Sequence, residues 1–170
     1  MKKIAYLVSI IGLATLFMAA TSEKESCDIK SLKKEGISNL NPFYYSSAKV
    51  SKITYDYTVR RKEIEVPLFK GEKYRMVFNK KSLPKDVVIE IYDKDKSHSS
   101  RTPLFSSAKQ DGNILSFEPE KSKRHYVNYV IPKAEGTEDE GCIVFVLGYQ
   151  LTFIDTSKDE EESEEESTEE

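Results

Sequence analysis

The chain has 170 residues, of which 38% are hydrophobic and 32% charged, with a net charge of −3. This composition is typical of a soluble folded domain, and no apolar run of membrane length follows residue 20. The charge is uneven: residues 155–170 contain ten acidic side chains and one basic one, whereas residues 21–154 contain 23 basic and 19 acidic ones. Neither stretch has the concentrated basic stripe that nucleic-acid binding requires, so we exclude nucleic acid as a partner.

Residues 1–20 have the pattern of a signal peptide. Lys2 and Lys3 precede an uncharged apolar run, Ile4 to Ala20, that ends in small residues. We therefore expect an exported protein that acts in the periplasm or outside the cell. The run is close to the ~20 residues that cross a bilayer, so an uncleaved anchor is the alternative. In that case this segment is the chain's only contact with a membrane.

The chain contains two cysteines, Cys27 and Cys142. Export places them in an oxidising compartment, where an even number of cysteines favours pairing. We predict a disulfide that ties the start of the mature chain to its last strand. Two free thiols are the alternative.

The first expected element of the mature chain is a short helix over residues 28–35. Asp28 can cap its beginning, Ile29 and Leu32 can face inward, and Gly36 is suited to its end. A turn over residues 39–42 follows, because asparagine and proline are frequent in turns.

From residue 51 onward the pattern is that of strands. Ile53, Tyr55, Tyr57 and Val59 alternate with polar residues, as in a half-buried strand. Seven further segments resemble strands, and the last is apolar on both faces, which indicates a central strand with room for a bend or bulge at Gly148. These segments are 63–68, 74–78, 87–92, 104–105, 113–117, 125–131 and 142–149.

The expected fold is all-β: an antiparallel, jelly-roll-like β-sandwich of about eight strands with one short N-terminal helix. We predict four regions along the chain. A signal peptide (1–20) precedes an N-terminal extension with the helix (21–49), and the β-sandwich domain (50–154) precedes an acidic tail (155–170). The tail repels itself and lacks apolar residues to bury, so we expect it to be disordered.

The stretch from Lys70 to Tyr149 resembles bacterial pre-peptidase C-terminal domains and related jelly-roll accessory modules. The similar segments are Gly71-Glu72-Lys73-Tyr74 at the start of a strand, Val88–Asp93 at a strand end, and the pair Ile114–Pro119 and Arg124–Val127. No peptidase domain accompanies them, so the chain also resembles secreted bacterial proteins of a single domain. The resemblance implies a binding or accessory role and assigns no catalytic residue.

No catalytic motif is evident. The sequence has no G-x-S-x-G nucleophile elbow, and its two histidines, His98 and His125, lie in a polar loop and in a strand. We expect His125 on the strand's solvent face. Glu63 and Glu65 share one face of a strand, where we also expect solvent rather than a glycosidase pair. We therefore predict a protein that is not an enzyme and needs no cofactor.

Two local patterns suggest binding sites. Asp93, Asp95 and Ser97 place oxygen atoms at alternate positions of a loop, as a calcium site would, although the loop lacks the glycine and glutamate of an EF-hand. Tyr44 and Tyr45 follow Pro42 in an expected loop, where they can bind a ligand or pack inward.

The sequence thus predicts an exported, non-enzymatic β-sandwich module that binds a protein or a glycan. A structural envelope or extracellular component that uses the acidic tail is the main alternative. A hydrolase and a calcium-dependent binding module are two further alternatives.

Overall fold

The computed structural model describes residues 27–135 and 140–152; the predicted signal peptide and acidic tail lie outside these residues. The described chain forms one helix, α2 (Ile29–Ser38), followed by eight strands. The strands are β1 (Tyr44–Thr54), β2 (Arg60–Val66), β3 (Glu72–Asn79), β4 (Val88–Tyr92), β5 (Pro103–Ser106), β6 (Ile114–Phe117), β7 (His125–Ile131) and β8 (Glu140–Leu151).

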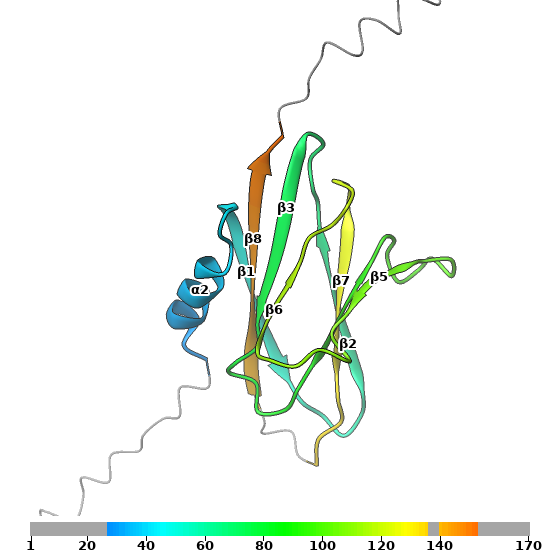
Figure 1. Cartoon of the computed structure of the whole chain (residues 1–170). Helices are drawn as coiled ribbons and strands as arrows, with labels where there is room; N and C mark the ends of the chain where they lie inside the picture. Colours follow the sequence, from blue (N-terminus) through cyan, green and yellow to red (C-terminus); the bar gives the residue numbers. More distant parts are fainter. Residues whose placement is uncertain (1–26, 136–139, 153–170) are drawn as a thin grey trace, which may run out of the picture.

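The strands make two four-stranded sheets that pack face to face (Figure 1). One sheet has the order β1-β8-β3-β6 and the other β2-β7-β4-β5, and every neighbouring pair is antiparallel. All connections except β4 to β5 cross from one sheet to the other, which is the arrangement of a jelly roll. The predicted all-β antiparallel sandwich is therefore confirmed.

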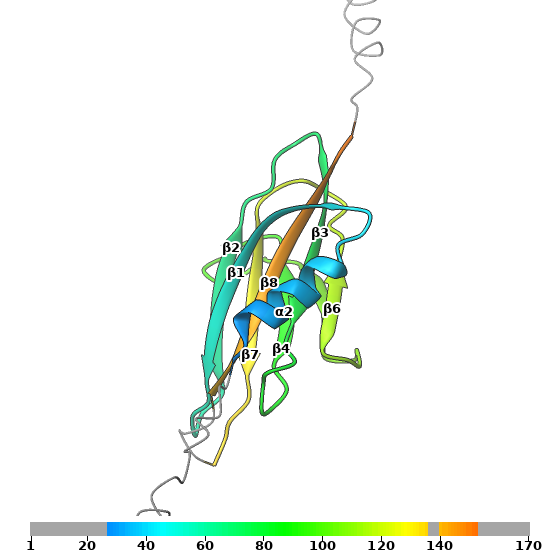
Figure 2. The same cartoon turned by 90° about the vertical axis from the view of Figure 1, so that its left-hand side faces the viewer.

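Strand β8 explains how one segment can be apolar on both faces. Ile143, Phe145 and Leu147 point between the sheets into the main core, whereas Cys142, Val144 and Val146 point outward. Helix α2 covers the outward row, as Figure 2 shows, and Leu32 and Leu40 complete a second apolar layer there. The predicted central position of β8 is confirmed, because it lies between β1 and β3.

Two contacts hold α2 on the sheet. The predicted Cys27–Cys142 disulfide is present, with 5.8 Å between the Cα atoms. The fully buried Asn79 side chain donates to the Leu32 carbonyl oxygen at 3.1 Å and to the Glu35 carboxylate at 3.0 Å. Helix α2 is thus a covering layer of the sandwich.

The beginning of α2 agrees with the prediction from the sequence, but its end does not. Asp28 caps the N-terminus as predicted and accepts a hydrogen bond from the Ser31 amide at 3.0 Å. The prediction that Gly36 ends the helix is wrong, since α2 continues to Ser38. Gly36 is instead a contact point: a Cβ atom there would lie 2.8 Å from Cγ2 of Val146, so only glycine allows this close approach.

The first strand begins and ends earlier than predicted. It starts at Tyr44, inside the expected N-terminal loop, and stops at Thr54. Ile53 and Tyr55 are fully buried as expected. Tyr57 and Val59 are 65% and 57% exposed, because the chain turns toward β2 after Tyr55. A hydrogen bond from the Tyr55 hydroxyl to the Lys85 carbonyl oxygen fixes the start of this turn.

Candidate functional site

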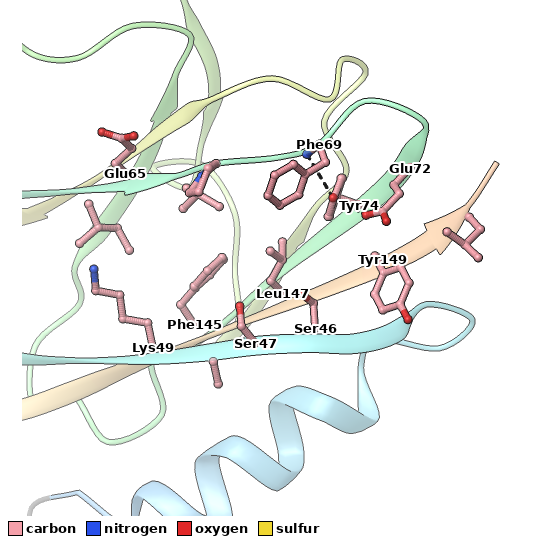
Figure 3. Close-up of a pocket in the computed structure, with 15 residues that line it drawn as sticks. Ser46, Ser47, Lys49, Glu65, Phe69, Glu72, Tyr74, Phe145, Leu147 and Tyr149 are labelled. Atoms are coloured by element: carbon pink, nitrogen blue, oxygen red, sulfur yellow. Dashed lines mark hydrogen bonds between the residues drawn. The ribbon is translucent and has the colours of Figure 1, made fainter. Parts of the chain in front are cut away.

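A cleft opens on the side of the sandwich where β1 and β2 are the end strands of their sheets (Figure 3). Its volume is ≈ 760 Å³. Phe145, Leu147 and Tyr149 of β8 form its floor, and Ile64 and Val66 of β2 form the opposite wall. The lining is therefore apolar at depth, and two edge strands bound it.

The sequence of β1 explains why this side is open. Along the inward-facing row of β1, Ile53 and Ser51 are buried, but Lys49 and Ser47 follow, and these two pair with Phe145 and Leu147 of β8. Serine and lysine cannot fill an apolar gap between two sheets, so the sheets are not sealed here. On the opposite side of the sandwich Phe105 and Phe117 do seal them, with ring centroids 5.3 Å apart.

An aromatic residue extends over one end of the cleft. Phe69, in the loop between β2 and β3, is 72% exposed although it lines the cleft. The Tyr74 hydroxyl accepts a hydrogen bond from the Phe69 amide at 3.2 Å and donates one to the Glu72 carboxylate. Burial and this bond to Glu72 raise the pKa of Tyr74, so the hydroxyl keeps its proton at neutral pH.

The loop that carries Phe69 is tied to the end of β8. Gly71 has a φ of 86°, a conformation in the left-handed region that glycine adopts without strain. Its carbonyl oxygen accepts hydrogen bonds from the Thr152 amide at 3.2 Å and the Thr152 hydroxyl at 2.7 Å. Phe69 is thus an exposed ring on a fixed loop, which is a favourable state for binding since little mobility is lost.

The other end of the cleft is bridged by a lysine. The Lys62 ammonium of β2 donates to the main-chain carbonyl oxygen of Lys52 of β1 at 3.2 Å. Between this bridge and Phe69, Lys49 extends from β1 toward β2 (Figure 3). It is the only basic residue among the described residues that line the cleft.

Tyr44 and Tyr45 do not form one site. Both belong to β1 instead of a loop, and adjacent strand residues point to opposite faces. Tyr44 lies 6.1 Å from the ring of Tyr149 at the cleft end, whereas Tyr45 lies over the outer surface, 5.1 Å from the ammonium of Lys33. A β-bulge in β1 between Tyr45 and Ser47, opposite the predicted bend position at Gly148, separates them from the rest of the strand.

The loop of the calcium prediction is held by its own hydrogen bonds. Asp93 accepts from the Thr102 amide at 2.6 Å, and Asp95 accepts from the Ser97 amide at 2.8 Å. The Ser97 hydroxyl and amide lower the pKa of Asp95 to about 2. These bonds close the loop, and the calcium site stays a prediction.

Both histidines are engaged in local structure. His98 lies 3.1 Å from Asp95 in the exposed loop. The expectation that His125 faces solvent is wrong: it is buried, and its Nδ1 donates to the Lys123 carbonyl oxygen at 2.8 Å. Burial lowers the pKa of His125, so the ring is neutral at pH 7. In the part of the chain that the structure describes, no three histidine, cysteine or acidic residues gather as metal ligands.

Glu63 and Glu65 lie on the outward face of β2, and each pairs with an arginine. Glu65 is exposed to solvent as predicted, whereas the side chain of Glu63 is only 13% exposed. Glu63 lies 3.1 Å from Arg101, and Glu65 lies 2.8 Å from Arg124. Each carboxylate therefore has a cationic partner, and the absence of a catalytic role stays a prediction.

Sequence patterns did not reveal Lys49 and Phe69. An inward lysine looks like any solvent-facing one when the strand's position is unknown. An apolar residue between Pro67 and Gly71, in an expected turn, was the available signal for Phe69.

The Cys27–Cys142 disulfide is compatible with the predicted export of the protein. Within residues 27–135 and 140–152, no helix has the length and apolar character needed to cross a bilayer. The sequence matches no protein-family model and no curated protein sequence.

Proposed function

We propose that this protein is an exported binding module without catalytic activity, which holds an extended segment of a partner protein in the cleft between β1 and β2. The observation that carries the proposal is the cleft itself, with an apolar floor and the exposed ring of Phe69 above it. Exposed aromatic residues beside apolar pockets are typical of residues that dominate binding energy.

The shape of the cleft favours a polypeptide over a glycan. Edge strands are common docking places for extended peptides, because their main-chain groups pair with those of the ligand. The chain contains no tryptophan, the residue that stacks best on sugar rings.

Replacing Phe69 by alanine is expected to weaken peptide binding by about tenfold or more while leaving the fold intact, because the ring is exposed. The probes are peptides selected from a phage-displayed random library on the mature chain, and their affinities are measured by calorimetry. Tyr57→Ala is the matched control, since Tyr57 is 65% exposed and does not line the cleft.

Two results would count against the proposal. The library could yield no binders, or its binders could have the same affinity for the Phe69→Ala variant. Binding of a glycan array that depends on Phe69 would instead favour a glycan ligand in the same cleft.

A further inference from the structure

Strand β1 has a free edge along the cleft. Ten of its 11 residues pair with β8 on one side, and among residues 27–135 and 140–152 no strand pairs with it on the other. The bond from Lys62 shows that the Lys52 carbonyl oxygen points to the free side. Main-chain groups alternate sides along an antiparallel strand, so the N–H and C=O groups of Ala48 and Val50 point the same way. A ligand strand can pair with these groups.

Lys49 lies beside this free edge and faces inward. The two acidic residues of the cleft lining are already engaged: Glu65 pairs with Arg124, and Glu72 accepts the hydrogen bond of Tyr74. Lys49 has no carboxylate within 4.0 Å among the described residues. Lys49 is exposed in the free protein, but a ligand strand over the cleft would remove its ammonium from bulk water. A carboxylate of the ligand is favoured there, since bonds between charged groups are stronger away from bulk water.

We propose that the ligand adds to β1 as an extra strand and places an aspartate or glutamate on the ammonium of Lys49. This inference rests on the proposed function and identifies the ligand as an acidic extended peptide of a separate protein. Side chains of a strand alternate between faces, so every second ligand residue enters the cleft. A ligand antiparallel to β1 therefore has the pattern acidic-x-apolar-x-apolar, in which the apolar residues lie over Leu147 and below Phe69.

An inward lysine can also serve another purpose. Natural sheets place charged residues at free edges to prevent pairing with other chains. The two roles differ in their consequences. If Lys49 prevents pairing with other chains, its removal lets the protein associate with itself. If Lys49 binds a ligand carboxylate, reversal of its charge changes which peptides bind.

A charge-reversal experiment distinguishes them. A phage-displayed library of random ten-residue peptides is selected on the mature chain and on its Lys49→Glu variant. We expect acidic residues at one inward position of the peptides selected on the original chain, and lysine or arginine there on the variant. The matched control is Lys52→Glu, which changes the same charge on the outer face of β1 and should leave the selected pattern unchanged.

A synthetic pair completes the test. The best acidic peptide and its glutamine counterpart are titrated into the original chain and the Lys49→Met variant. We expect about a tenfold loss of affinity from the glutamine in the peptide and about the same loss from Lys49→Met. The two changes together should cost little more than one alone, as for two groups that contact each other.

Five outcomes would overturn the inference. Peptides that need Phe69 but show no acidic preference would contradict this inference and leave the proposed function intact. An absence of peptides that need Phe69 would contradict both the inference and the proposed function. Self-association of the original chain through β1 in sedimentation would place a second copy in the cleft. A tenfold gain in affinity on deleting residues 155–170 would make the chain's own acidic segment the occupant. Self-association of Lys49→Met with unchanged affinity for both peptides would make Lys49 a guard only.

Discussion

Replacing Phe78 by alanine is expected to lower the free energy of unfolding by about 3–5 kcal/mol. Phe78 is fully buried in β3 between the two sheets, and its ring centroid lies 5.2 Å from that of Phe145. The substitution removes a large apolar surface from the core and leaves a cavity that the rigid surrounding strands fill only in part. Urea-induced unfolding monitored by circular dichroism measures the loss.

Phe69→Ala is the matched control for this experiment, because it removes the same side chain from an exposed position. We expect it to change the free energy of unfolding by no more than about 0.5 kcal/mol. Equal losses for the two variants would contradict the assignment of Phe78 to the core and of Phe69 to the ligand-accessible surface.

Removing the disulfide is expected to have an effect of similar size. The bond joins residues 115 positions apart, so it restricts nearly the whole unfolded domain. For a loop of this length the chain-entropy model gives about 5 kcal/mol of stabilisation, and the bond also holds α2 against the outward row of β8. We expect the Cys27→Ser, Cys142→Ser double variant to lose this amount.

The same denaturation measurement gives the loss, with the original chain in a strong thiol reductant as the control. The reduced original and the double variant should unfold at the same urea concentration. A difference below about 1 kcal/mol between the oxidised chain and the double variant would contradict the role of the disulfide as the main attachment of the N-terminal segment.

Much of the fold follows from local patterns in the sequence. The run 142–149 is apolar at every position through Leu147, and such a run requires cover on both faces, which the opposite sheet and α2 supply. The pairing of Cys27 with Cys142 follows from their number and the predicted export.

The differences arise where long-range contacts override a local pattern. Gly36 has the properties of a helix end, but the helix continues past it to Ser38. The residue is glycine because a side chain there would clash with Val146. The alternating residues Tyr57 and Val59 extend the pattern of β1 past its end, since the chain must cross there to the other sheet.

The cleft could not be predicted because it depends on which strands end each sheet. The inward-facing Lys49 and Ser47 of β1 leave a gap only because β1 and β2 are both end strands on the same side. That arrangement is a property of the jelly-roll order, which no single segment of the sequence encodes.

Amide hydrogen exchange at Ala48 and Val50 tests the central claim most directly. Their N–H groups point to the free edge of β1, so they should exchange readily in the free protein and at least tenfold more slowly once a Phe69-dependent peptide pairs with β1. The Lys49 amide, which points toward β8, should be protected in both states. Peptide binding that leaves the exchange of Ala48 and Val50 unchanged would contradict a ligand strand on β1.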